Sequence, residues 1–541
     1  MGAPVTVLIA AMETRGFNYL GRDSARRLSF EGPLNTTVGQ HACDVRIDSN
    51  FFHLPVVRLK EIPTALQPIA PHVGSDGGIC YLAANTVVID IFDPVGQTLR
   101  CIEEAESVLD RGLKKEMIED LAEEFLIHWF SRLCYIDVRQ PQPGAISAFC
   151  VGARKGLRIP VITEDAPRTI KRLEIMGADT QREPMPAFIV KTSAVPRPLQ
   201  TKWPPENVAD VLNWQRVLDG RCARKIQQRL VEAYAQSKKD AVILIQSPHL
   251  TYGFQVHFDD STLPDTRRQS VRGTELLYSF RITRLASVKI DDRFIAQRNI
   301  PNQKTLGGKH IAIVGCGTIG GYLADMLAKA GAGTEGGRLT LIDFDTLSPH
   351  NIGRHRLGLP YAFLTKAEGM RIMLEGESPG IQVKALSVDV RHANIDSPDI
   401  LIDASGEEAL GHWLTSNYVS EMPMLSVWIE GPGTAVRALF KNSVEGACYR
   451  CLSTYQRLGK FPTIQGGIPY VMAGHGCEGP YVPFPATVSV QAAALGAEMV
   501  LAWANGKSMH ALRTRVTDPD YSGATADCDP QKIEACPACG S

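Results

Sequence analysis

Residues 309–333 read KHIAIVGCGTIGGYLADMLAKAGAG, and this stretch decides the fold of the second half of the 541-residue chain. Residues 310–314 form a continuous apolar run, which is typical of a buried parallel strand. Gly315, Gly317 and Gly320 then give G-x-G-x-x-G, and a helical segment follows directly. A helix that begins at such a turn points its free N–H groups and positive dipole end at the turn, where phosphate binds. The stretch therefore predicts a nucleotide-binding α/β domain.

The residues after the next strand indicate which nucleotide binds. RLTLIDFD predicts a second strand that ends in acid, and Asp343 is placed to bond the hydroxyl pair of a ribose. Asn351, Arg354 and Lys366 follow at close spacing. Two cations and an amide suit a triphosphate and the charge that develops at its α-phosphorus, which hydride transfer does not require. The pattern favours ATP over NAD, with an NAD-dependent oxidoreductase or a non-catalytic nucleotide-binding scaffold as alternatives.

These motifs resemble the ThiF/MoeB adenylyltransferase family, which includes the ubiquitin-activating enzymes. The family pattern is a strand, G-x-G-x-x-G and a helix, then Asp-x-Asp, Asn, Arg and Lys, which this sequence matches with Gly315, Gly317, Gly320, Asp343, Asp345, Asn351, Arg354 and Lys366. The resemblance implies a Rossmann-like domain with a mostly parallel sheet. It implies that Asp343 holds the ribose of ATP and that Asn351, Arg354 and Lys366 contact the phosphates.

Two further features of the family are altered in this chain. The family holds Mg²⁺ near an Asp-x-x-Asp motif, but LIDASGEEAL keeps Asp403 and has Gly406 at the second position, so Asp403 or Glu407 could serve. The family also supplies an arginine from a helix before the glycine turn. DDRFIAQRNI offers Arg293 or Arg298 for this role, and the sequence does not choose between them.

The cysteines of the second half form two pairs and leave one residue over. Cys448 and Cys451 form one C-x-x-C motif and Cys536 and Cys539 another, and four thiolates at this spacing predict a tetrahedral zinc site with a structural role. The ThiF/MoeB family carries such pairs in the same order. Cys477 remains, between glycines in YVMAGHGCEGPYVPFP. Its placement is similar to that of the cysteine which forms a thioester in activating enzymes.

The first half contains PHVGSDGGICYL at residues 71–82. This stretch resembles ubiquitin-conjugating enzymes, in which His-Pro-Asn and a glycine-containing turn precede Ile-Cys-Leu. The resemblance makes Cys80 the thiol that holds an acyl group and places His72 on the family's Asn, which steadies an oxyanion. His72 could donate a hydrogen bond in the same way, act as a general base, or pack with no chemical task.

A fused activating and conjugating enzyme resembles the bacterial ubiquitin-transfer-like proteins of CBASS antiphage operons. The resemblance implies that a protein C-terminus becomes an acyl-adenylate, passes to Cys477 and Cys80 as a thioester, and is conjugated to an acceptor amine. The C-terminus would belong to a cGAS-like nucleotidyltransferase or to a ubiquitin-like protein. The resemblance also implies a homodimer through the adenylation domain. A sulfur-carrier adenylyltransferase of cofactor biosynthesis, with Cys80 incidental, is the main alternative.

Bulk properties set the remaining expectations. The net charge of −1 gives no reason to expect a nucleic acid or a membrane partner, and 13 cysteines without an export signal favour a reducing, cytoplasmic setting. We expect an α/β protein with a ubiquitin-conjugating-like α+β domain at 1–150, a connecting domain at 151–290 and an adenylation domain at 291–541. Apolar periodicity predicts one long helix at 102–133 and another at 214–236. VTVLIAA near the N-terminus resembles a strand, as do HACDVRI, NTVVIDIF and VILIQSP.

Overall fold

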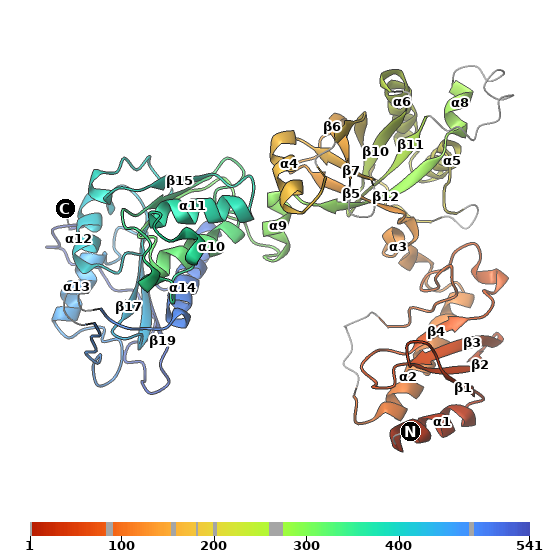
Figure 1. Cartoon of the computed structure of the whole chain (residues 1–541), viewed down its shortest axis with the longest axis horizontal. Coiled ribbons are helices and arrows are strands. Elements are labelled where there is room, and N and C mark those ends of the chain that lie inside the picture. The colour runs from red at the N-terminus through yellow and green to blue at the C-terminus, as the bar shows by residue number, and fades with distance from the viewer. Residues whose placement is uncertain are drawn as a thin grey trace. The chain divides into compact units, whose positions relative to one another are not determined.

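The structure is a computed structural model, and it describes residues 3–82, 90–152, 158–179, 182–198, 203–237, 239–258, 274–474 and 481–540. The chain divides into two compact units. The first comprises Met1–Ile136, Gln140–Thr163 and Gln181–Val288, and the second comprises Asp137–Arg139, Glu164–Thr180 and Lys289–Ser541. The predicted α/β class is confirmed (Figure 1).

The N-terminal part of the first unit is a four-stranded antiparallel meander. Its strands, in the order β1-β2-β3-β4, are Asn18–Arg22, Leu28–Thr36, Gly39–Ile47 and Val56–Leu59. Helices α1 (Ala3–Thr14) and α2 (Pro94–Leu113) pack with the meander around one hydrophobic core, and a 3-10 turn, η1, covers Thr64–Leu66. The strand predicted for HACDVRI is confirmed as part of β3. VTVLIAA is helical, so the strand predicted there is wrong, and NTVVIDIF falls largely outside the described residues.

The long helix predicted at 102–133 is wrong beyond Leu113. Helix α2 begins at an Asp93 N-cap with Pro94 in its first turn and ends at Leu113. A turn, the 3-10 helix η2 (Ile118–Ala122) and the short helix α3 (Phe125–Trp129) follow. The apolar stripe that predicted one helix serves two hydrophobic cores instead, because Leu109 packs in the N-terminal core and Trp129 in the next one.

The rest of the first unit is built on an eight-stranded sheet in the order β7-β5-β12-β11-β10-β9-β6-β8, which an additional β7–β6 pairing closes on itself. In chain order β5 to β12 are Arg132–Asp137, Gly144–Gly152, Arg158–Thr163, Arg182–Pro184, Ala187–Lys191, Asp240–Gln246, Thr251–His257 and Ile282–Lys289. The helices of this stretch of the chain are α4 (Ala166–Ile175), α5 (Val208–Leu218), α6 (Gly220–Gln236) and α8 (Thr274–Ser279). The helix predicted at 214–236 is two helices separated at Asp219, and VILIQSP is confirmed as β10. Helix α4 belongs to the second unit.

The second unit has a seven-stranded sheet in the order β15-β14-β13-β16-β17-β18-β19. In chain order β13 to β19 are His310–Val314, Arg338–Ile342, Val383–Leu386, Ile400–Asp403, Met424–Glu430, Ala435–Lys441 and Leu512–Val516. Strands β13 to β17 are parallel, and β18 and β19 continue the sheet antiparallel. The chain moves from β13 outward through β14 to β15 and then returns to place β16 on the other side of β13. Ligands of such sheets bind at this switch in direction, outside the carboxyl ends of the strands.

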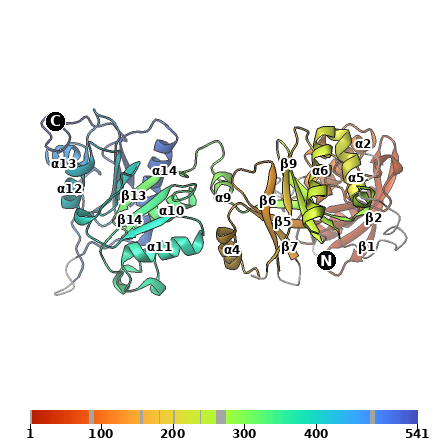
Figure 2. The same ribbon diagram turned by 90° about the horizontal axis from the view of Figure 1, so that it is seen from above.

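Helices cover both faces of this sheet, as Figure 2 shows. The helices of the unit are α9 (Asp292–Arg298), α10 (Thr318–Lys329), α11 (Lys366–Glu377), α12 (Glu408–Tyr418), α13 (Tyr449–Arg457) and α14 (Ala486–Ala504), with 3-10 turns η4 (Pro349–Asn351), η5 (Leu359–Tyr361) and η6 (Val390–His392). Helices α10, α11 and α14 share one hydrophobic core, and α12 packs on the opposite face. Helix α14 is long and apolar enough to span a membrane, but half of it is buried and its Leu495 and Met499 are core residues.

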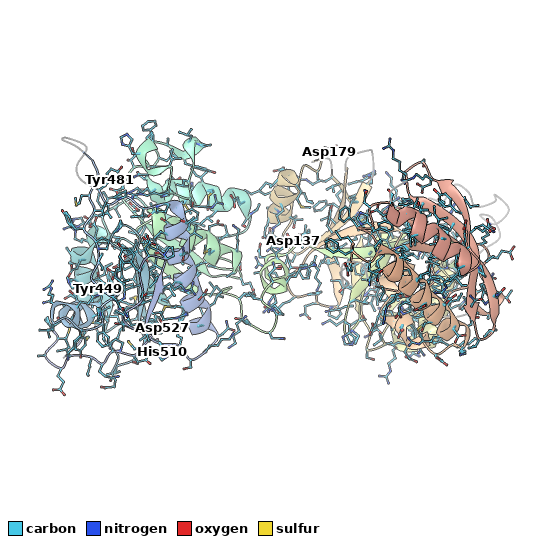
Figure 3. All side chains as sticks on the ribbon, turned by 90° about the horizontal axis from the view of Figure 1, so that it is seen from below. Asp137, Asp179, Tyr449, Tyr481, His510 and Asp527 are labelled. Carbon is cyan, nitrogen blue, oxygen red and sulfur yellow. The ribbon has the colours of Figure 1, made fainter. Side chains whose placement is uncertain are left out.

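The division at residues 150 and 290 stays a prediction. Strand β6 runs across residue 150 and pairs with β7, β8 and β9 of the eight-stranded sheet. Near residue 290, an ion-pair cluster joins three short segments of the second unit. Arg168 and Arg172 of α4 contact the fully buried Asp137, and Arg172 also contacts Asp292 of α9 (Asp137 is marked in Figure 3).

Candidate functional site

The glycine turn of the second unit lies where β13, β14 and β16 end. Gly315 has a φ of +86°, and a Cβ there would lie 2.7 Å from the Cα of Ser405. A Cβ at Gly320 would collide with the carbonyl oxygen of Gly315. A Cβ at Gly317, by contrast, would meet nothing within 4 Å. The first and third glycines therefore permit close packing of the turn, while the second leaves space beside the start of α10.

Asp343 follows β14 and fastens this turn. Its Oδ2 accepts a hydrogen bond from the Cys316 N–H at 2.7 Å, and its Oδ1 accepts one from the Asp345 N–H at 2.8 Å. Burial raises the pKa of this carboxyl above its usual value. The side chain lines a cavity at the end of β14 and also supports the backbone of the turn, and its bond to a ribose stays a prediction.

His355 also supports this turn, and the sequence analysis did not single it out. Its Nε2 is 2.8 Å from the carbonyl oxygen of Cys316, and its Nδ1 accepts a hydrogen bond from the Leu357 N–H at 3.0 Å. Since Nδ1 accepts, Nε2 carries the proton and donates to Cys316. Burial lowers the pKa of His355 to about 4, so the ring is neutral at physiological pH. Only its position directly after Arg354 could have drawn attention to it.

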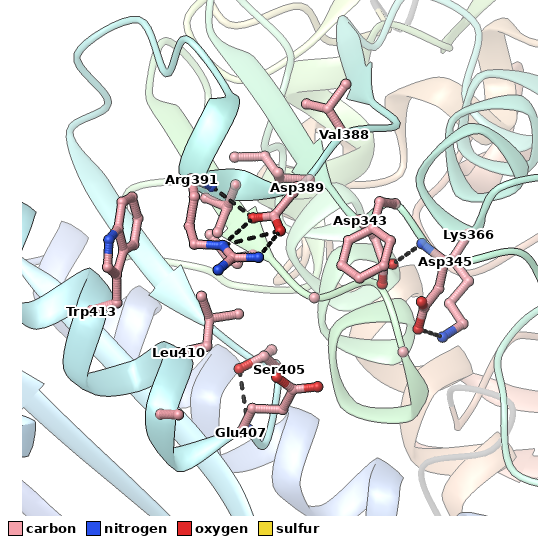
Figure 4. A pocket seen from close by; sticks show the side chains of 18 residues that line it. Asp343, Asp345, Lys366, Val388, Asp389, Arg391, Ser405, Glu407, Leu410 and Trp413 are labelled. Carbon is pink, nitrogen blue, oxygen red and sulfur yellow. Dashed lines mark hydrogen bonds and ion pairs between the residues drawn. The ribbon is translucent and has the colours of Figure 1, made fainter.

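A cavity of about 450 Å³ opens at the ends of β13, β14 and β16, as Figure 4 shows. Asp343, Asp345 and Lys366 line one side of it, and Trp413 and Leu410 of α12 line the other. The remaining polar side chains around it are Asp389, Arg391, Ser405 and Glu407. Apolar side chains opposite a carboxylate suit a nucleoside, which has a flat base and a hydroxylated sugar.

A second cavity of about 370 Å³ shares Gly317, Lys366, Ala404 and Ser405 with the first. Asn351 and Arg354 line its far side. Lys366 stands at the boundary between the two cavities, and its Nζ lies 2.6 Å from Oδ2 of Asp345. The structure thus brings together the residues of the predicted phosphate site: Gly317, Asn351, Arg354 and Lys366.

Arg354 joins the second cavity to the segment that follows Cys477. Its Nη1 donates to the carbonyl oxygen of Val482 at 3.0 Å, and its guanidinium lies 4.5 Å from the ring centre of Phe484 and 5.8 Å from that of Tyr481 (Tyr481 is labelled in Figure 3). Cys477 itself lies outside the described residues. On either side of it, the backbones of Ala473 and Tyr481 exchange hydrogen bonds of 2.8 and 2.9 Å.

The carboxylates offered for Mg²⁺ differ in their access to the cavity. Oδ1 of Asp403 accepts from the N–H and the hydroxyl of Ser405, and Oδ2 faces the position of Gly411. Burial raises the pKa of Asp403. Glu407 and Asp345, unlike Asp403, line the 450 Å³ cavity. Carboxylate oxygens are the ligands that Mg²⁺ takes, and of the two carboxylates predicted for this role Glu407 lines the cavity, together with Asp343, Asp345 and Asp389.

Helix α9 carries the two arginines considered for the remaining role. Arg293 lies 3.5 Å from Glu335, and Arg298 is exposed in the last turn of the helix. Neither arginine lines the two cavities. The choice between them stays open.

The four cysteines of the C-x-x-C motifs meet in the second unit. Their Sγ atoms lie within 4.8 Å of one another, with separations of 3.7 Å for Cys448–Cys451, 3.7 Å for Cys448–Cys536 and 3.5 Å for Cys451–Cys539. A tetrahedron with Zn–S bonds of about 2.3 Å has edges of about 3.8 Å. The four sulfurs therefore fit zinc, and since all four positions are filled by protein the site suits a structural ion.

Cys80 lies in a loop of the first unit that is pinned at both ends. Bridges join Val73 to Ile79 and Arg58 to Gly78, and the Cys80 N–H donates to the carbonyl oxygen of His72 at 2.8 Å. Cys80 is exposed, whereas the other described cysteines are buried or partly buried. Burial of its thiol, and secondly the charge of Glu124, raise its pKa, so the group is a protonated thiol at neutral pH.

His72, whose carbonyl oxygen accepts the hydrogen bond from the Cys80 N–H, has an unusual backbone conformation. Its φ is +61°, a region that non-glycine residues rarely adopt. Two carboxylates that the sequence analysis missed, Asp120 and Glu124, contact its ring. They come from η2 and the start of α3, about fifty positions further along the chain, so no local pattern could have connected them to Cys80.

Comparisons with known proteins agree with both halves of this description. Residues 291–537 match the ThiF family model, and residues 11–133 match the model for Prokaryotic E2 family B. The chain is 49% identical to an ATP-dependent ubiquitin transferase-like protein, Cap2, of Pseudomonas aeruginosa, over 100% of this chain and 99% of that protein. It is 24% identical to an Escherichia coli protein of the same name over 74% of each chain. It is 29% identical to the E. coli molybdopterin-synthase adenylyltransferase over 32% of this chain and 70% of that protein.

Proposed function

The chain belongs to the family of the ATP-dependent ubiquitin transferase-like protein Cap2, and from this premise we propose that it activates a protein C-terminus and conjugates it to an amine through two cysteines. Family membership makes it an enzyme with an adenylyltransferase domain. The individual steps are our proposal. The observation that carries them is the pair of adjoining cavities with Lys366 at their boundary.

The first step is adenylation. A carboxylate oxygen of the substrate attacks the α-phosphorus of ATP, an O–P bond forms, and pyrophosphate leaves. The nucleoside occupies the cavity with Asp343 and Trp413, and the acyl group enters the cavity with Asn351 and Arg354. Lys366, at the boundary, meets the charge that develops on the phosphate, together with the N–H groups that begin α10.

The second step moves the acyl group to Cys477. Its sulfur attacks the acyl carbon, a C–S bond forms, and AMP leaves with the electron pair of the C–O bond. The support for this step is chain reach. Cys477 is five positions before Val482, which Arg354 contacts at the wall of the second cavity, and five residue steps span at most about 18 Å.

The third step passes the acyl group to Cys80 by thiol exchange, and an amine then attacks the Cys80 thioester. The exposed position of Cys80 and the match of residues 11–133 to an E2 family support this step. A sulfur-carrier adenylyltransferase would leave both features without a role.

We propose one metal ion for catalysis and one for the fold. Magnesium would neutralise the phosphates, with Glu407 and Asp345 as its carboxylate ligands and Asp403 beneath them. Zinc would be held by Cys448, Cys451, Cys536 and Cys539 and would stabilise the fold of the second unit.

The biological setting is also part of our proposal, and the family resemblance supports it. We place the enzyme in the cytoplasm, as a homodimer, in antiphage defence. Its acyl donor would be a cGAS-like nucleotidyltransferase or a ubiquitin-like protein.

The test uses purified chain with ATP, Mg²⁺ and each of these two donors in turn. We expect ATP–pyrophosphate exchange that depends on the donor, and a thiol-sensitive adduct on non-reducing gels. Cys80→Ala should abolish conjugation and leave an adduct on Cys477, and Cys477→Ala should keep the exchange reaction and lose both adducts. Cys528→Ala, a partly buried cysteine outside the zinc cluster, is the matched control. Full conjugation by Cys80→Ala, or binding of NAD without any exchange reaction, would refute the proposal.

A further inference from the structure

We propose that Phe484 is a positioning residue for adenylation, whose ring holds the guanidinium of Arg354 at the second cavity so that this cation meets the phosphates of ATP. The inference rests on the proposed adenylation step and adds the side chain that orients one of the cations of that step.

The backbone of Arg354 is fixed relative to the glycine turn, but its side chain is not. The N–H groups of Arg354 and His355 both donate to the carbonyl oxygen of Asn351, at 3.1 and 3.0 Å, and the ring of His355 donates to the carbonyl oxygen of Cys316. These bonds set the position of the Arg354 Cα. Several rotatable bonds lie between that atom and the guanidinium, so the charged group is placed only where other groups hold it.

Two groups from the segment before α14 hold the guanidinium. Nη1 of Arg354 donates to the carbonyl oxygen of Val482 at 3.0 Å, and the guanidinium carbon lies 4.5 Å from the ring centre of Phe484. A cation within about 6 Å of an aromatic ring centre is attracted to the face of the ring. The ring of Tyr481 is further away, at 5.8 Å, and this side chain is half exposed. Because any residue at position 482 supplies a carbonyl oxygen, Phe484 is the side chain on which the position of the cation depends.

Phe484 is itself held in place by the core of the second unit. It directly precedes Pro485, the N-cap of α14, and it packs against the hydrophobic core that α14 shares with α10 and α11. Gly433, at a φ of +91°, makes room for it, since a Cβ at this glycine would lie 3.2 Å from the Cβ of Phe484 and 2.9 Å from Cγ2 of Val488. The ring is therefore a fixed surface that can orient a long and flexible side chain.

An aromatic ring orients Arg354 without neutralising its charge. Lys366 pairs with Asp345 at 2.6 Å and Arg356 pairs with Asp325 at 2.7 Å, whereas Arg354 forms no ion pair with any residue that the structure describes. The described residues that line the second cavity also include no aspartate or glutamate. A carboxylate partner would compete with phosphate for the guanidinium, while a ring face and one carbonyl oxygen leave most of its N–H groups and its full charge available.

The experiment measures binding to the full-length chain, so that no acyl donor is required. The probe is the α,β-methylene analogue of ATP together with Mg²⁺, because this analogue cannot release pyrophosphate. Its dissociation constant is measured by titration calorimetry. Adenosine, which lacks the phosphates, is titrated in the same way, and thermal unfolding shows whether each variant is folded.

We expect Phe484→Leu, which keeps an apolar side chain and loses the ring face, to weaken binding of the analogue about tenfold, within the range of a cation–π contact. Its affinity for adenosine should be unchanged. Phe484→Tyr keeps the ring and should recover most of the affinity, and Tyr481→Leu should show a smaller loss than Phe484→Leu. The matched control is Trp503→Leu, which removes a ring 5.4 Å from Nζ of Lys309 near the other end of α14 and should leave both affinities unchanged.

A double-mutant cycle tests whether the ring acts through the arginine. Arg354→Gln removes the charge and should weaken binding of the analogue more than Phe484→Leu does. In the Arg354→Gln background, Phe484→Leu should have no further effect, because the ring then has no cation to orient.

Each failure has a separate meaning. If Phe484→Leu binds the analogue as the wild type does, or if its loss adds to that of Arg354→Gln, the inference is wrong while the adenylation step stands. If Phe484→Leu weakens binding of adenosine and of the analogue equally, the ring only supports the fold and the positioning role is wrong. If Arg354→Gln binds the analogue like the wild type, Arg354 does not contact the phosphates, and the inference fails together with that contact. A wild-type chain that binds neither ligand, and shows no ATP–pyrophosphate exchange with either donor, would refute the proposed function itself.

Discussion

The two reactive regions of this chain differ in how their residues are brought together. In the second unit, Gly315, Asp343 and Ser405 follow three neighbouring parallel strands, so the topology of the sheet alone collects them at one edge. In the first unit, Cys80 and Glu124 are joined only by the course of irregular chain around η2. A site built on strand ends leaves a regular trace in the sequence, and a site built on loops does not.

Two histidines illustrate the same difference. His355 is buried, and its ring hydrogen-bonds the Cys316 carbonyl oxygen and the Leu357 amide. Its lowered pKa keeps it neutral, and it therefore supports the backbone of the glycine turn. His72 is partly exposed and has a carboxylate at each ring nitrogen. The first environment excludes a charged ring, whereas in the second each ring nitrogen faces a carboxylate.

The largest effect is expected from a substitution in the predicted zinc site, which should destabilise the second unit and leave the first unit unaffected. Cys451→Ser removes one of four sulfurs that surround one point. We expect loss of about one zinc ion per chain and a destabilisation of the second unit by more than about 5 kcal/mol, since zinc contributes roughly 10–16 kcal/mol in small finger peptides. Metal analysis and thermal unfolding provide the measurements, with Cys528→Ser as control. Unchanged zinc content and unfolding in Cys451→Ser would contradict the assignment.

Lys366→Ala should impair the adenylation reaction of the second unit without affecting the reactivity of Cys80 in the first unit. The lysine stands at the boundary of the two cavities, so its loss should lower ATP–pyrophosphate exchange roughly 10²–10³-fold, as for removal of other preorganised groups that meet developing charge. The acylation of the Cys80 thiol by a small synthetic acyl thioester, which requires no ATP, should be unchanged. Lys384→Ala, which removes a surface lysine paired with Asp396, is the control. Equal loss of both activities would mean that Lys366 serves the fold and not the adenylation step.

The site at the strand ends of the second unit could be predicted from the sequence to a larger extent than the loop site of the first unit. The glycine turn, Asp343, Arg354, Lys366 and the four cysteines of the C-x-x-C motifs were recognisable, because each belongs to a motif with fixed spacing. Asp120 and Glu124 were not, because the apolar stripe around them predicted one continuous helix. That stripe is shared by two cores, and the chain turns between them at Lys115, whose φ is +60°. Periodicity reports which residues are buried but not in which core they are buried.

The neutral His355 should appear as a pH dependence of stability in the second unit. Its pKa is about 4 when folded and about 6.5 in the unfolded chain, so between these values the unfolded state binds more protons. Stability should fall by up to about 3 kcal/mol as the pH drops from 6.5 towards 4. His355→Gln should remove this part of the slope in urea unfolding, relative to the exposed control His350→Gln. A slope that is the same in His355→Gln and the wild type would contradict the neutral, buried state.

The smallest effect concerns the N-termini of two helices, because a side chain caps α6 whereas the N-cap residue of α10 is a glycine. Asp219 caps α6 by accepting from the Arg221 and Cys222 N–H groups at 2.9 and 3.1 Å. At the start of α10, within the described part of the chain, the N-cap residue Gly317 has no side chain to cap the first amides of the helix, which leaves them for a phosphate. Asp219→Ala should therefore destabilise the first unit by about 1 kcal/mol, Asp219→Asn should restore most of it, and ATP should stabilise only the second unit in thermal scans. If ATP also raised the unfolding temperature of the first unit, ATP would not act only at the uncapped N-terminus of α10. The contrast between the capped helix α6 and the ligand-binding helix α10 would then be wrong.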